Sequence, residues 1–130
     1  MEQNERVQFM GYIDDLLRST SAGKIVWKPV NPSTFVWESQ GARLSFQRVE
    51  RAGPTTTIMR GGRPVQIAGG VQVSYLFQVL QLTDQTQVPM LSVDSSQDQE
   101  ITQSFSKLFE LIKTGISERS LEFLRSILPK

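Results

Sequence analysis

The sequence of 130 residues contains no histidine and no cysteine. These two side chains supply most of the proton shuttles, transition-metal ligands and thiol nucleophiles that proteins use near neutral pH. Their absence argues against a transition-metal site, a Ser-His or Cys-His nucleophile pair, a disulfide framework and a thiol redox switch. We therefore expect no cofactor and no enzymatic activity, and a binding function becomes the leading hypothesis.

The sequence also lacks long apolar runs and a strong charge of either sign. No apolar stretch approaches the roughly 20 residues that a membrane-spanning helix needs. The first six residues are polar and acidic, unlike the basic and apolar regions of a secretory signal. The formal net charge is only +1, so the molecule as a whole gives no argument for nucleic acid or an anionic membrane as a partner. We expect a cytoplasmic protein without a membrane partner.

The apolar residues that are present predict one helix followed by strands. Phe9, Ile13 and Leu16 repeat at helical spacing and predict a first helix over about residues 3–19. Alternation of apolar and polar residues then predicts five strands, the fifth after a polar hairpin loop at 83–87. These strands contain residues 25–27, 35–37, 44–46, 71–82 and 88–93. The fourth is apolar on both faces and carries almost no charge, as expected of a central strand.

The last third of the sequence predicts two helices. Side chains at 94–98 can accept hydrogen bonds from the first amides of a helix whose buried stripe spans residues 101–112, and Gly115 is expected to end it. Ser117 then caps a last helix in which Leu121, Leu124 and Leu128 face inward. The prediction is one α+β domain over residues 1–130: a five-stranded, mainly antiparallel sheet with an N-terminal helix and two C-terminal helices.

Residues 51–70 form an unusually long connection for a small domain, rich in glycine, proline and threonine. They belong to the most basic part of the chain, residues 43–70, which contains five arginines and only one acidic residue, a glutamate. One interpretation is a hairpin extension that pairs residues 56–58 with 65–67 across Gly61 and Gly62. The other is a loop that gathers arginines around an acidic protein surface or a phosphate. The candidate partner-binding residues are Arg43, Arg48, Arg51, Arg60 and Arg63.

Two further clusters allow either a structural or a functional interpretation. Trp27, Phe35 and Trp37 fit the core of a sheet, and alternatively the wall of a ligand pocket or an interface anchor. The carboxylates at positions 94, 98 and 100 fit helix capping better than a cation site, because the glycine and terminal glutamate of a calcium loop are missing.

Residues 16–27 read LLRSTSAGKIVW. This segment resembles small bacterial α+β proteins of unassigned function, in which an amphipathic helix precedes a Thr-x-x-Gly-Lys-x-x-Trp segment, an antiparallel sheet and one or two helices. Thr20, Gly23, Lys24 and Trp27 match that pattern. The resemblance implies a bacterial or phage origin and an α+β fold, and it implies no activity.

The leading functional hypothesis is a non-catalytic protein-interaction module: a homodimer, or an adaptor, inhibitor or immunity-type partner of a larger bacterial protein. The alternative is a nucleic-acid or phosphate-ligand binder that uses the arginines of residues 43–63. Residues 51–70 contain no aromatic side chain to stack on bases, which favours the protein partner. The salt dependence of binding distinguishes the two hypotheses, because binding led by phosphate contacts weakens steeply as salt is added.

Overall fold

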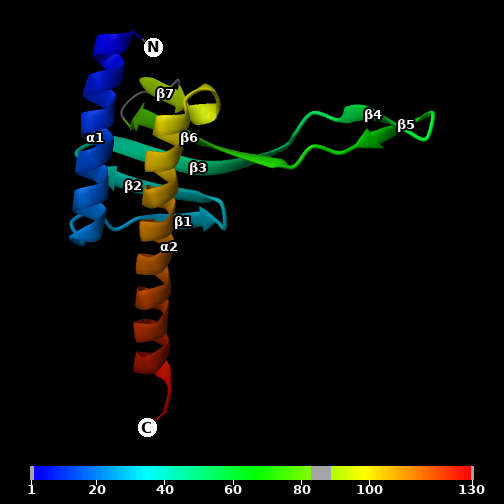
Figure 1. The fold of residues 1–130 in the computed structure, drawn as a ribbon. Coiled ribbons are helices and arrows are strands. Elements are labelled where there is room, and N and C mark those ends of the chain that lie inside the picture. Colours follow the sequence, from blue (N-terminus) through cyan, green and yellow to red (C-terminus); the bar gives the residue numbers. More distant parts are fainter. Residues whose placement is uncertain (1, 83–88, 130) are drawn as a thin grey trace.

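The computed structural model describes residues 2–82 and 89–129 and contains two α-helices, seven strands and a short 3-10 turn (Figure 1). The helices are α1 (Gln3–Ser21) and α2 (Gln99–Ile127), and the 3-10 turn is η1 (Ser95–Gln97). The strands are β1 (Lys28–Asn31), β2 (Thr34–Ser39), β3 (Ala42–Ala52), β4 (Thr56–Arg60), β5 (Arg63–Ile67), β6 (Val71–Gln81) and β7 (Leu91–Asp94).

Five strands form one antiparallel sheet in the order β1-β2-β3-β6-β7, with both helices on one face of it (Figure 1). The two central strands are the longest, and they pair without a break from Ala42 with Gln81 to Ala52 with Val71. The predicted α+β class with an N-terminal helix and an antiparallel sheet is confirmed. No described helix is both long enough and apolar enough to cross a membrane.

The core is aromatic and lies between the sheet and the helices. Phe46 of β3 and Phe105 of α2 are fully buried, and their ring centroids are 5.1 Å apart. The ring centroid of Phe9 in α1 lies 6.0 Å from that of Phe105, so both helices contribute rings to the same cluster. Trp27 and Phe35 are buried, and Trp37 packs against them partly covered, so this cluster belongs to the core.

The expected break between two C-terminal helices is absent, because α2 continues through Gly115 for 29 residues. A glycine inside a helix costs about 1 kcal/mol relative to alanine, which the favourable residues on either side can offset. Ser117 therefore lies within the helix and does not cap a new one. The expectation that Leu121, Leu124 and Leu128 face inward is also wrong, since the three side chains are 47–64% exposed.

Strand boundaries differ from the expectation at both edges of the sheet. Ile25 and Trp27 are buried but belong to the connection between α1 and β1, which begins only at Lys28. The last strand begins at Leu91. The loop expected at 83–87 and the expected strand start at Val88 lie outside the described residues.

Candidate interaction surfaces

A β-hairpin, here called the arm (residues 56–67), projects away from the sheet (Figure 1). Its strands β4 and β5 pair antiparallel, from Thr56 with Ile67 to Arg60 with Arg63. The turn consists of Gly61 and Gly62, whose φ angles of 56° and 77° are both positive. Two-residue hairpin turns favour this backbone because it matches the twist of the strands, and glycine adopts it without strain.

One face of the arm is apolar along its length and basic at its tip. Residues directly opposite each other in an antiparallel pair share a face, so Ile58 lies beside Val65, and Arg60 beside Arg63. Val65 is 37% exposed and Ile67, on the same face, 46% exposed. Like charges directly opposite each other destabilise a hairpin. The arm therefore holds two guanidinium groups in an unfavourable pair that an external acidic group would relieve.

The five candidate arginines do not form one basic surface. Three of them pair with carboxylates of the same chain: Arg43 with Glu38 at 2.8 Å, Arg48 with Glu50, and Arg51 with Asp94 at 3.5 Å. The contact with Glu50 raises the pKa of Arg48, whose guanidinium also lies 5.9 Å from the ring centre of Phe109. Among the described residues, Arg60 and Arg63 have no ion pair. Of the five candidates, only Arg60 and Arg63 are exposed and without an ion pair in the part of the chain that the structure describes.

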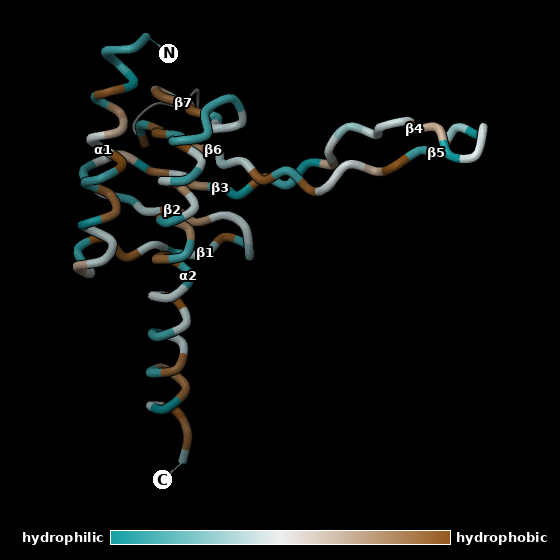
Figure 2. The backbone as a smooth tube through the Cα atoms, in the orientation of Figure 1, coloured by the Kyte–Doolittle hydropathy of each residue, from teal (hydrophilic) through white to brown (hydrophobic). Residues whose placement is uncertain are grey.

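The second candidate surface is the far end of α2 together with its C-cap residue Leu128, that is residues 117–128, here called the α2 tail. It extends beyond the edge strand β1, and apolar residues recur along it in Figure 2. Every side chain of the tail is exposed. The sequence pattern identified its apolar residues but gave no sign that the sheet ends before them. They are Leu121 (64% exposed), Phe123 (66%), Leu124 (47%), Ile127 (59%) and Leu128 (55%).

A shallow hollow joins the tail to the edge of the sheet. Its volume is about 340 Å³, and its lining includes Val26 and Pro29 near β1 together with Ile116 and Phe123 of α2. Val26 is 45% exposed, and Val30 of the neighbouring strand 63%. The apolar surface of the tail therefore continues onto the sheet edge.

The segment that resembles small bacterial proteins builds the connection from α1 to the sheet. Trp27 donates a hydrogen bond from Nε1 to the Thr20 hydroxyl at 3.0 Å, and Gly23 provides a positive φ of 76° between them. Arg119 of the α2 tail donates to the Trp27 carbonyl at 3.0 Å. These contacts give Thr20, Gly23 and Trp27 structural roles, whereas Lys24 is exposed and nothing in the structure explains its place in the pattern.

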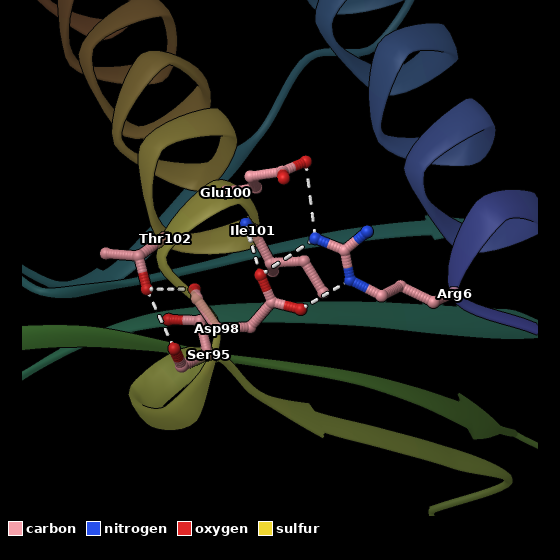
Figure 3. A network of polar contacts seen from close by, with 6 residues as sticks. All are labelled: Arg6, Ser95, Asp98, Glu100, Ile101 and Thr102. Carbon is pink, nitrogen blue, oxygen red and sulfur yellow. Dashed lines mark hydrogen bonds and ion pairs between the residues drawn. The ribbon is translucent and has the colours of Figure 1, made fainter. Parts of the chain in front are cut away.

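The carboxylates near the start of α2 make hydrogen bonds and ion pairs within the chain (Figure 3). Asp98 accepts hydrogen bonds from the Ile101 amide at 3.2 Å and from Arg6 of α1 at 2.7 and 3.1 Å, and Arg6 also lies 3.3 Å from Glu100. The Arg6 guanidinium lowers the pKa of the Asp98 carboxyl below its ordinary value. Asp94 accepts a hydrogen bond from the Ser96 amide. Within residues 2–82 and 89–129, no group of three or more acidic residues could hold a metal ion.

No protein-family model, no curated protein and no solved structure matches the chain. The arm and the α2 tail are the surfaces of the described chain that suggest a function.

Proposed function

We propose that the protein is a non-catalytic interaction module whose arm binds an acidic surface of a protein partner. The observation that carries the proposal is the register of the arm, which places Arg60 directly opposite Arg63 at the end of a projecting apolar face. Guanidinium groups form paired hydrogen bonds with carboxylates, and apolar neighbours strengthen such bonds by excluding water.

The geometry also explains why a projecting hairpin suits this task. The Gly-Gly turn keeps the tip narrow, so both arginines can enter a concave acidic site together. The adjacent residues Ile58 and Val65 then supply apolar area behind the charged tip. Interfaces commonly combine a buried apolar centre with charges that set orientation and specificity.

The nucleic-acid alternative has weaker support. Arg43, Arg48 and Arg51 are engaged by carboxylates, which leaves two arginines instead of a basic track. The arm carries no aromatic side chain. Proteins that bind single strands usually combine a basic groove with aromatic stacking surfaces.

Affinity capture from a nuclease-treated lysate of the source organism tests the proposal. Wild-type protein is compared with Arg60→Glu/Arg63→Glu and with the matched control Lys24→Glu/Lys107→Glu, which changes net charge equally at exposed sites elsewhere. We expect one protein to be retained by the wild type and the control and lost with the arm variant. Capture of the same proteins by all three chains would overturn the proposal. Nucleic acid that the wild type retains from a lysate without nuclease treatment, and releases steeply as salt is added, would favour the alternative instead.

A further inference from the structure

The α2 tail is the end of a 29-residue helix, and its apolar side chains are left exposed. Most helical stability in proteins comes from packing an apolar face, so a helix end that exposes one gains from a partner that covers it. Residues 117–127 remain helical, yet their apolar side chains are 47–66% exposed. Among the described residues, Arg119 donates the one side-chain hydrogen bond from this segment to another element, and Ser120 bonds only to the Ile116 carbonyl one turn earlier in the same helix.

The apolar side chains of the tail continue the buried stripe of α2. Phe109, Ile112 and Ile116 lie on the core side of the helix, and Phe123 and Ile127 follow at the same helical spacing. Leu121, Leu124 and Leu128 lie beside them and widen the apolar face. A continuous apolar face that passes beyond its own sheet is suited to a second helix of similar character.

The charges of the tail are arranged for pairing with an identical helix in the opposite direction. Glu118 and Arg125 are seven residues apart and so lie on the same flank of the apolar face, two turns from each other. In an antiparallel pair, Glu118 of each chain faces Arg125 of the other, which gives two ion pairs. A parallel two-fold pair would instead place this flank of the two chains on opposite sides of the interface, so Glu118 and Arg125 would form no such pairs.

A dimer through the tail has to bury surface beyond the tail itself. The tail alone is about 16 Å long and about 10 Å wide, which is less than the roughly 800 Å² per partner of a standard interface. An antiparallel pair centred near Leu121 and Glu122 brings the partner's Ile127 level with Ile116. That position adjoins the 340 Å³ hollow beside Val26 and Pro29, so the sheet edge joins the buried surface.

We infer that the protein forms a two-fold symmetric dimer in which the α2 tails of two chains pack antiparallel, each reaching the hollow beside the other chain's β1. Dimers with two-fold symmetry are the commonest protein oligomers, and their interfaces must be self-complementary. The apolar stripe and the Glu118–Arg125 pairing satisfy that condition within one helix. The arm takes no part in this interface, so the inference does not depend on the function proposed above.

Sedimentation equilibrium of wild-type protein and of Leu124→Asp tests the dimer. We expect twice the chain mass for the wild type and the single-chain mass for the variant. The near-UV circular dichroism of the core aromatic residues should be unchanged, because Leu124 lies outside the core. Ser126→Glu, on the polar side of the same helix, is the matched control and should remain dimeric. A monomeric wild type at all accessible concentrations would overturn the inference, including a monomer that binds anionic vesicles through the tail. So would a dimer that survives Leu124→Asp.

Charge exchange tests the antiparallel direction. Glu118→Arg alone should weaken dimerisation about tenfold or more, because both ion pairs become repulsive. The double exchange Glu118→Arg/Arg125→Glu should restore it. Failure of the double variant to recover, with the single variant weakened, would contradict the antiparallel arrangement. Arg60→Glu/Arg63→Glu should leave the dimer intact, which separates a failure of this inference from a failure of the arm hypothesis.

Discussion

The two halves of α2 have the same apolar spacing but opposite surroundings. In the first half, Phe105, Leu108 and Ile112 are at most 2% exposed because the sheet and α1 cover them. In the second half, Phe123 and Ile127 lie on the continuation of the same stripe and are 66% and 59% exposed. A helical pattern therefore shows that a face is apolar, and the length of the neighbouring sheet decides whether that face is buried within one chain.

The largest expected difference between the halves is the cost of removing one aromatic ring. Phe105→Ala should lower the free energy of unfolding by about 3–5 kcal/mol, because it opens a cavity among the core rings. Phe123→Ala should change it by no more than about 0.5 kcal/mol in a monomeric Leu124→Asp background, since the ring is already solvated there. Urea denaturation measures both, and equal losses would show that the second half is packed within one chain.

Gly115→Ala tests whether the halves are one helix. In a continuous helix, alanine should raise the free energy of unfolding by up to about 1 kcal/mol. The added Cβ would lie 3.3 Å from Nη1 of Arg119, which is the flexible end of a side chain and can move aside. If the helix ended at this glycine with a positive φ, alanine would destabilise the protein instead. Thermal denaturation measures this change in stability, and its sign shows whether α2 is continuous through Gly115.

Arg119→Ala tests the side-chain link between the tail and the core. Its hydrogen bond to the Trp27 carbonyl should contribute no more than about 1 kcal/mol, because the arginine is exposed. Arg125→Ala, without such a bond in the described structure, should have no measurable effect in the same monomeric background. An equal loss in both variants would argue against this link.

The smallest expected difference concerns the start of the first half, where Asp98 pairs with Arg6 at the surface. Because folding lowers the pKa of Asp98 below its ordinary value of 3.8, this pair stabilises the protein above about pH 4, and the stabilisation is lost as pH falls through the lower, folded-state pKa. Asp98→Asn can still cap the helix but has no charge to titrate. Its stability should therefore fall less steeply below about pH 4 than that of the wild type, as measured by denaturation at a series of pH values.

Local patterns in the sequence predicted much of the fold. The apolar, nearly uncharged run of residues 71–82 predicted the central strand, and Gly61-Gly62 between β-favouring residues matched the hairpin that the structure contains. The continuation of α2 through Gly115 could not be predicted, because a glycine ends one helix and is tolerated in another depending on tertiary contacts. The strand expected at Ile25 and Trp27 is a connection in the structure. Both side chains are buried, as in a strand, but these residues precede the first strand of the sheet.

The candidate surfaces were only partly predictable. The arginines are close in sequence, but pairing with carboxylates separates Arg43, Arg48 and Arg51 from the two at the tip of the arm, and those partners depend on strand register. The tail was predicted to be buried, since its spacing is that of a core helix. What the sequence could not show is that β1 lies at the edge of the sheet, with no further strand beyond it among those described.

Hydrogen exchange along α2, measured over a range of protein concentrations, shows whether the second half of the helix is covered only when two chains meet. We predict slow exchange of the amides of residues 101–112 at every concentration. The amides of residues 117–127 should exchange fast in dilute protein and slow down as concentration rises and the tails pair. Fast exchange of residues 117–127 at all concentrations would show that the tails do not pair. Equal protection of both halves of α2 at the lowest protein concentration would show that the second half is covered within one chain.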